Sequence, residues 1–294
     1  MDQYMQDVKE KRVELILRQL EQLPTLPVVA VKILEATGRK DTSGAQIAEL
    51  IKLDPALTIK VLKLVRRADM GVRGEVSTVD KAVSLLGFDC IRSAVLAISA
   101  MGVFPVESTN GSKRFDRLEF WKHSLAVGSA AELIAERYKD MDPSEAFVCG
   151  LLHDIGKIAL DSILPKSYER VLEASDLLRG NIADVERTAI GIDHMVAGKR
   201  LSEQWQLPGV IRDCIWLHDH NPETLPEGLP NAKMVNLVTL ADILVRQQHI
   251  GHSGNYSTHV IEANLRKTLN LEEAAYEEIK KKVIKRIESR AADL

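Results

Sequence analysis

Apolar residues recur at helical spacing along almost the whole chain, and this periodicity restricts the fold more than any other feature. Strict alternation of apolar and polar residues never persists, and turn dipeptides do not recur at hairpin spacing, so no strand is predicted. Leu, Ala, Ile, Val, Glu and Lys dominate, and aromatic residues make up only 4% of the chain, which favours helix over strand. We therefore expect an all-α protein.

Capping residues mark where individual helices begin. Thr42 or Ser43 fits the N-cap of one helix, and Asp54 followed by Pro55 opens the next. Asp142 ahead of another proline gives a third start signal. The segments expected to be helical are residues 26–37, 42–53, 54–68, 77–87, 88–104, 120–138, 142–154, 182–190, 193–205, 207–220, 231–251 and 271–290, with a loop region just before residue 182.

The best candidate for a domain boundary is PVESTNGSKR, residues 105–114. This segment is polar, is rich in Ser, Thr, Asn and Gly, and separates two helical regions. We expect a smaller N-terminal helical subdomain at residues 1–105, followed by a multi-helix bundle at residues 115–294.

Charge and cysteine content exclude several classes of protein. A net charge of −3 gives no support to a general nucleic-acid binder. Cys90, Cys149 and Cys214 form no CxxC pair, which indicates reduced thiols in a cytosolic protein. The longest uncharged apolar run is too short to span a bilayer, and the charged N-terminus does not resemble a signal peptide. We expect a cytoplasmic protein with no membrane partner.

The stretch GLLHDIGKIAL, residues 150–160, places two metal-ligand types side by side. Chance alone would give about one HD dipeptide in every two such chains, so the pair by itself is weak evidence. We expect His153 and Asp154 in the last turn of a helix that stops at Gly156, so that both side chains project beyond its end. Lys157, past that stop, could approach the same point as a positive charge.

Other His and Asp residues lie on helix faces or at helix ends. His123 and Asp242 share faces with apolar residues, and a buried carboxylate such as Asp242 needs a cation or strong donors. His194 opens a helix, and His218 closes one. Taken singly, each has an ordinary alternative, namely a satisfied core histidine, a helix cap, a salt bridge or a solvated helix end. Taken together, this mixed nitrogen and oxygen set suits Fe, Mn, Ni, Zn or Mg rather than a thiolate zinc site.

The order of His123, then His153 with Asp154, then Asp242 resembles the HD superfamily of helical metal-dependent phosphohydrolases. More specifically, the chain resembles an HDOD-domain protein over about residues 20–245. The motifs that carry the resemblance are, in order, LPTLPVVAVKIL, DPALTIKVLKLVRRADMG, STVDKAVSLLGFDCIRSAVLAISAM, FWKHSLAVGSAAELIA, EAFVCGLLHDIGKIAL and DHMVAGKRLSEQWQLPGVIRDCIWLHDHNP.

This resemblance implies an HD-domain-like helical bundle, a role in bacterial signalling through protein contacts, and a site for one or two divalent metal ions. The implied metal ligands are His123, His153, Asp154, His194, His218 and Asp242, with Asp219 and His220 as candidates for further ligands. If the protein is an enzyme, Asp154 would bridge two metals and Lys157 would stabilise phosphate charge.

Two positions depart from the related patterns. Asp219 stands where HD-GYP phosphodiesterases have a second His, and no GYP sequence follows it; Arg66-Arg67-Ala68 replaces the usual Asn-Ser-Ala of HDOD sequences. A non-catalytic signalling regulator is therefore our first hypothesis. The second is a metal-dependent phosphohydrolase or phosphodiesterase acting on a nucleotide, a cyclic dinucleotide or another phosphoester.

A third and weaker hypothesis concerns nucleic acid. Basic residues recur at helical spacing at Lys60, Lys63, Arg66 and Arg67, with Arg73 close behind. A solvated helix face explains this pattern more simply, and no aromatic or base-reading residues accompany it. We therefore do not expect a nucleic-acid partner.

Overall fold

The computed structural model describes residues 2–37, 42–65, 78–106, 111–256 and 261–291. Within these ranges every regular element is a helix, which confirms the predicted all-α fold. None of the helices in these ranges is both long enough and apolar enough to cross a bilayer. The helices are α1 (Asp2–Glu21), α2 (Val28–Thr37), α3 (Gly44–Lys52), α4 (Pro55–Val65), α5 (Val79–Leu86), α6 (Phe88–Val103), α7 (Arg117–Ala135), α8 (Pro143–Leu152), α9 (Ile155–Ile163), α10 (Pro165–Leu178), α11 (Ile182–Ala189), α12 (His194–Gln204), α13 (Gly209–Leu217), the short 3-10 helix η2 (Pro222–Thr224), α14 (Ala232–Gln247), α15 (Glu262–Thr268) and α16 (Glu273–Ala291).

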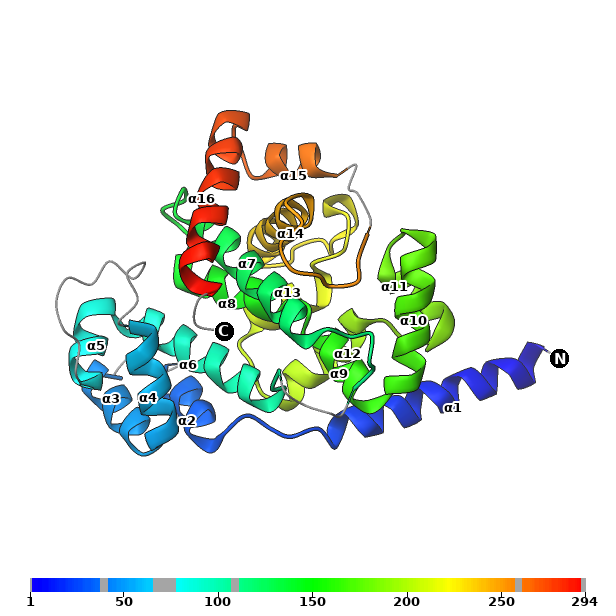
Figure 1. Cartoon of the computed structure of the whole chain (residues 1–294), viewed down its shortest axis with the longest axis horizontal. Helices are drawn as coiled ribbons and strands as arrows, with labels where there is room; N and C mark the ends of the chain where they lie inside the picture. Colours follow the sequence, from blue (N-terminus) through cyan, green and yellow to red (C-terminus); the bar gives the residue numbers. More distant parts are fainter. Residues whose placement is uncertain (1, 38–41, 66–77, 107–110, 257–260, 292–294) are drawn as a thin grey trace.

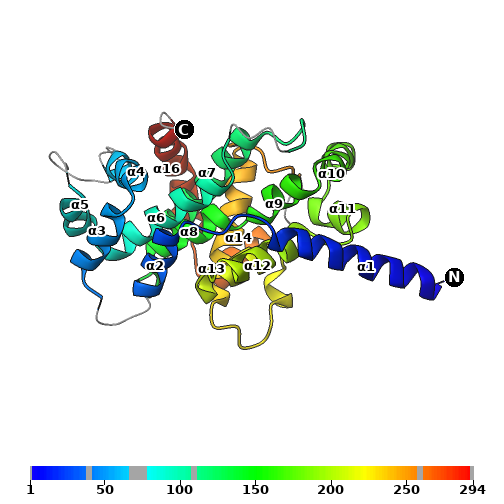
Figure 2. The ribbon, with the colours of Figure 1, turned by 90° about the horizontal axis from the view of Figure 1, so that it is seen from below.

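The first helices gather at one end of the molecule. Figure 1 shows α2–α5 side by side, with α6 leading from them to α7 and α8 in the middle. Helix α1 runs along the other side of the bundle and extends beyond it (Figure 2). Gln204 on α12 donates a hydrogen bond to the backbone oxygen of Glu21 at 3.0 Å, and Arg12 donates to that of Ala189 at 2.6 Å. These bonds fasten α1 to the later helices.

Tight contacts cross the segment predicted to separate two domains. The indole of Trp121 donates to the backbone oxygen of Phe104 at 3.1 Å, and the rings of Phe104 and Trp205 lie 6.1 Å apart. Beyond that point, the backbone N–H of Ser112 donates to Oδ1 of Asp161 on α9 at 2.7 Å. One hydrophobic cluster includes residues from both sides, from Ile47, Leu96 and Phe104 to Leu151.

Capping residues act largely as expected. Ser43 is the N-cap of α3 and forms a reciprocal capping box with Gln46. Asp54 accepts a hydrogen bond from the backbone N–H of Leu57 at 3.0 Å, directly ahead of α4. Asp142 caps α8 by accepting from the backbone of Ser144. Of the basic residues considered for nucleic acid, Lys60 is exposed on α4; the side chain of Lys63, and Arg66, Arg67 and Arg73, lie outside the described residues.

The predicted helix stop at Gly156 is wrong. Helix α8 ends at Leu152 with His153 as its C-cap, and α9 begins at Ile155, so that Gly156 and Lys157 both lie in a helix. A Cβ atom at Gly156 would lie 1.8 Å from the backbone oxygen of His194. Glycine is therefore required for close packing of α9 against α12. The region before residue 182, predicted to be a loop, consists mainly of α9 and α10.

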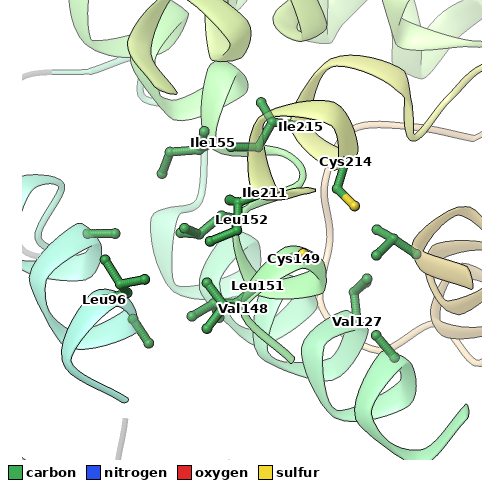
Figure 3. Packing of buried hydrophobic residues seen from close by; sticks show 14 of the residues in the cluster. Leu96, Val127, Val148, Cys149, Leu151, Leu152, Ile155, Ile211, Cys214 and Ile215 are labelled. Atoms are coloured by element: carbon green, nitrogen blue, oxygen red, sulfur yellow. The ribbon is translucent and has the colours of Figure 1, made fainter. Parts of the chain in front are cut away.

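The helices that carry the His and Asp residues share one apolar core. Figure 3 shows Leu152 of α8 and Ile155 of α9 facing Ile211 and Ile215 of α13. Cys149 and Cys214 are buried in the same region, and neither they nor the half-buried Cys90 forms a disulfide. This core fixes the C-terminal ends of α8 and α13, which are followed directly by His153 and by His218.

Candidate metal centre

Six side chains from four helices and from the junction of α8 and α9 meet in the interior. His123 comes from the middle of α7 and Asp242 from the middle of α14, whereas the other four lie at helix ends. None of the six exposes more than 4% of its surface. The six residues are His123, His153, Asp154, His194, His218 and Asp242, all of which were singled out in the sequence.

Four of these side chains form the first group. Nε2 of His123 lies 3.1 Å from Oδ1 of Asp242, and Nε2 of His153 lies 3.3 Å from Oδ2 of Asp154. The distance from His153 to Asp242 is 3.8 Å, and that from His123 to Asp154 is 3.9 Å. Adjacent ligands of an ion held at about 2.1 Å lie roughly 3.0–3.4 Å apart, so a small inward shift would place all four atoms around one ion.

The other oxygen of Asp154 faces the second group. Its Oδ1 lies 3.3 Å from Nε2 of His218 and 3.5 Å from Nε2 of His194, and these two nitrogens lie 3.3 Å from each other. One carboxylate thus presents one oxygen to each group. A carboxylate placed in this way could bridge two ions. Among the described residues, two sets of three have ligand atoms close enough for a shared ion: His123, His153 and Asp242, and His153, Asp154 and His218; His194 belongs to neither set.

Hydrogen bonds on the far side of three imidazole rings orient them toward the centre. Nδ1 of His153 lies 2.7 Å from the backbone oxygen of Gly150, and Nδ1 of His218 lies 3.1 Å from that of Ile215. Nδ1 of His194 lies 2.6 Å from Oε2 of Glu186. A carbonyl or carboxylate oxygen accepts, so Nδ1 carries the proton and a neutral ring points the lone pair of Nε2 inward.

This arrangement is electrostatically unfavourable unless a cation is present. The inward lone pairs of His194 and His218 face each other at 3.3 Å. Nε2 of His123 and of His153, and Oδ1 of Asp154 and of Asp242, are buried without a hydrogen bond from any described residue. Buried acceptors without donors are costly, and one divalent ion in each group would satisfy them. The residues present therefore fit a metal ion.

The protonation states also suit metal ligands. Burial opposes ionisation of Asp154, but nearby positive charge, that of Lys157 included, outweighs it and holds the pKa of this carboxyl well below its usual range. Burial likewise opposes ionisation of Asp242, and Arg246 and His123 lower its pKa well below normal. Burial lowers the pKa of His123. Two carboxylates and a neutral imidazole are the forms that bind metals.

Two cations, one buried and one partly buried, compensate the carboxylates. Nζ of Lys157, 1% exposed, lies 2.7 Å from Oδ2 of Asp154. A guanidinium nitrogen of Arg246 lies 2.8 Å from Oδ2 of Asp242, which supplies the cation that the sequence required for a buried carboxylate. Sequence reasoning did not identify Arg246, although its spacing of four residues from Asp242 on one helix was a usable signal.

Glu186 is a second residue that sequence reasoning missed. Its Oε2 binds both Nδ1 and the backbone N–H of His194, at 2.6 and 2.8 Å, and its Oε1 accepts from the hydroxyl of Tyr168 at 2.9 Å. The side chain is fully buried on α11. A carboxylate that orients a ligating imidazole fixes its tautomer and raises its basicity.

Replacing Glu186 by Gln should weaken binding of divalent metal by about 10- to 100-fold, because the amide no longer holds the proton firmly on Nδ1 of His194. Isothermal titration of the metal-free variant with Zn²⁺ and Mn²⁺ would measure this loss. Glu203→Gln, on the exposed surface of α12, is the matched control. Equal affinities of the Glu186→Gln variant and the wild type would show that Glu186 does not position a ligand.

The metal-free protein should lose stability as the pH falls below about 6.5. The pKa of His123 is lower in the folded chain than in the unfolded chain, so the unfolded state binds more protons in that range. One such proton gives a slope of up to about 1.4 kcal/mol per pH unit. Urea unfolding in chelator between pH 5 and 7.5 measures the slope, which should be smaller in His123→Gln; an unchanged slope in that variant would contradict the assignment.

The structure does not bring Asp219 and His220 into either group. Asp219 accepts a hydrogen bond from Asn181 at 2.6 Å, so its carboxylate is bound to the loop before α11. His220 follows the C-terminal end of α13, and burial and the nearby His218 lower its pKa. Neither belongs to the sets of described residues with mutually close ligand atoms. Their role as further ligands stays a prediction.

An all-helical bundle with a buried cluster of His and Asp side chains contributed by several of its helices defines a protein of the HD-like class. The sequence model of the HDOD domain family matches residues 23–222, and the chain belongs to that family.

Comparisons with other proteins agree with this assignment. An HDOD domain protein of unknown function from Geobacter sulfurreducens is 26% identical, with a TM-score of 0.75, over 95% of this chain and 97% of that one. A Marinobacter aquaeolei VT8 protein, proposed to act in signal transduction, shares the fold at 17% identity and a TM-score of 0.77, over 97% of this chain and 65% of that one. An uncharacterized Treponema pallidum protein is 25% identical over 77% of this chain, and the match spans less than half, 43%, of that protein's length.

Proposed function

We propose that the protein is a signalling regulator that holds one or two divalent metal ions in its later helices and acts mainly through contacts with other proteins. The observation that carries this proposal is closure of the site: none of the six candidate ligand residues, nor Lys157, exposes more than 4% of its surface. Structural metal sites are closed, whereas catalytic sites keep a position open to water or substrate.

The ion would join helices that are distant in sequence. His123, His153, Asp154 and Asp242 would hold one ion, and His194 and His218 would hold a second with the other oxygen of Asp154. Mixed imidazole and carboxylate ligands suit Fe, Mn, Ni, Zn or Mg. Binding energy from such a site adds to folding energy, because the unfolded chain has no preformed site. We infer that metal loading stabilises the conformation that a signalling partner recognises.

A second candidate function is metal-dependent hydrolysis of a phosphoester, with a nucleotide or cyclic dinucleotide as substrate. Lys157 favours it, since a buried ammonium 2.7 Å from Asp154 could stabilise negative charge on a phosphoryl group close to the ions. A bound ion would supply Lewis acidity and an activated water. For this chain, the closed site must open before any substrate can enter.

Turnover distinguishes the two functions. Purified protein loaded with Mn²⁺, Fe²⁺, Ni²⁺, Zn²⁺ or Mg²⁺ would be assayed against cyclic nucleotides, cyclic dinucleotides, guanosine polyphosphates and a generic phosphodiester, with Asp154→Ala as the control. We expect no turnover above that of the control. Metal-dependent turnover that disappears in Asp154→Ala would overturn the purely regulatory function and establish the second candidate.

We further propose that the protein works in the cytoplasm with a signalling protein as partner, and that residues 1–105 are the N-terminal helical part of the HDOD module and residues 115–294 its metal-site part. The net charge of −3 argues against nucleic acid as that partner. A salt-sensitive complex with nucleic acid that is lost on replacing Lys63 and Arg67 would contradict this choice.

A further inference from the structure

Residues 249–256, here called the strap, cross from the end of α14 to α10 and the start of α11 (Figure 1). The backbone N–H of His252 donates to the backbone oxygen of Glu119 on α7 at 3.1 Å. The hydroxyl of Ser175 on α10 donates to the backbone oxygen of Gly254 at 2.8 Å. The strap therefore ties the helix that carries His123 to α10.

The strap lies directly on the turn of α7 that carries His123. Gly251 has a φ of 64°, and a Cβ atom there would lie 2.3 Å from the backbone nitrogen of His123. Ser253 is buried, and Gly254 packs against Leu172 and Ile182. Because this contact is backbone against backbone, movement of the strap would uncover the outer side of the α7 turn that carries His123.

A chain of hydrogen bonds fastens the strap to α10. Nδ1 of His252 accepts from the backbone N–H of Gly254 at 3.2 Å, so the ring proton is on Nε2. Nε2 lies 2.8 Å from the hydroxyl of Tyr256, which in turn donates to Oδ1 of Asp176 at 2.5 Å. The guanidinium of Arg179 lies over the ring of Tyr256, 4.4 Å from its centroid. This chain requires His252 to be neutral.

The surroundings of His252 carry charges of both signs. Asp176 and Arg179 approach it from α10, Lys157 from α9 and Glu119 from α7. Arg114 and Asp116 line the same cavity, of about 100 Å³, from the segment before α7. Partial burial lowers the pKa of His252, Asp176 raises it and Lys157 lowers it, with a net lowering. The ring is also partly exposed, so protons from solvent reach it directly.

We propose that the strap is a proton-sensitive cover of the candidate metal centre, and that proton uptake at Nδ1 of His252 releases it from α10. Protonation turns Nδ1 from an acceptor into a donor, so the bond from the N–H of Gly254 is lost. The fastened strap requires neutral His252. The strap is therefore fully fastened when the pH is above about 6.5, the pKa of histidine in an unfolded chain, and it loosens as the pH falls. This inference goes beyond the proposed function, because it requires neither a bound ion nor turnover.

Hydrogen–deuterium exchange of the whole metal-free protein tests it. After correction for intrinsic exchange rates, protection of residues 251–256 should fall by about threefold to tenfold between pH 7.5 and 5.5, as expected for loss of one hydrogen bond. His252→Gln, which cannot be protonated, should abolish this pH dependence. His249→Gln, which replaces an exposed histidine of the same strap, should retain it.

A second variant keeps the test decisive if His252→Gln changes the strap by itself. Tyr256→Phe removes the hydroxyl that links His252 to Asp176, and it should leave the strap poorly protected at both pH values. Unchanged protection of wild-type residues 251–256 across this range would overturn the proposal, as would a pH dependence that persists in His252→Gln. Metal affinity, measured separately, decides the proposed function, so failure of one does not imply failure of the other.

Discussion

Replacing Asp154 by Asn should remove most of the divalent metal from the protein, lowering its affinity by more than about 100-fold, because loss of an outer partner alone costs 10- to 100-fold. The reason is geometric, since Oδ2 of Asp154 faces His123 and His153 while Oδ1 faces His194 and His218. The neutral amide offers only one oxygen and no negative charge. Equilibrium dialysis followed by elemental analysis measures bound metal per chain.

Asp140→Asn is the matched control for this substitution. Asp140 is exposed and pairs with Lys233 at 2.7 Å, and it belongs to neither group of candidate ligands. This variant should bind metal as the wild type does. Wild-type metal content in Asp154→Asn would contradict the bridging role, and equal losses in both variants would show that the metal is bound elsewhere.

Replacing Gly156 by Ala should destabilise the protein by about 4 kcal/mol or more. The added Cβ would lie 1.8 Å from the backbone oxygen of His194 and 2.7 Å from the backbone nitrogen of Gly198. Backbone atoms cannot rotate away as a side chain can, so α9 and α12 must separate. His194 begins α12, and this separation should also reduce metal affinity.

Urea unfolding of the metal-free proteins measures the change in stability. Gly102→Ala is the control, because Gly102 is an exposed residue of α6 and a Cβ atom there meets nothing within 4 Å. That variant should be slightly more stable, by about 0.5–1 kcal/mol, since alanine favours helix. A Gly156→Ala variant as stable as the wild type would contradict the close packing of α9 on α12.

The sequence predicts most of the helices and the candidate ligands because both depend on local patterns. Ser43, Asp54 and Asp142 mark helix starts with side-chain chemistry that acts over two or three residues. His123 and Asp242 are recognisable because a polar residue on an apolar helix face needs a buried partner. The all-α fold follows directly from this periodicity.

What the sequence does not predict depends on contacts between distant segments. Gly156 looks like a helix stop, since no local signal distinguishes a terminating glycine from one that admits another helix. Glu186 orients His194 across the start of α12, and its place on a short amphipathic helix gave no indication of that contact. Tertiary packing decides both, and helix propensity does not.

Anomalous diffraction tests the central claim most directly. Crystals of protein loaded with Zn²⁺ or Mn²⁺, measured at the absorption edge of that metal, should show a peak about 2.1 Å from Nε2 of His123 and His153 and from the carboxylates of Asp154 and Asp242. A second ion would appear between Asp154, His194 and His218. Peaks only elsewhere on the protein, with these side chains unchanged, would contradict the account.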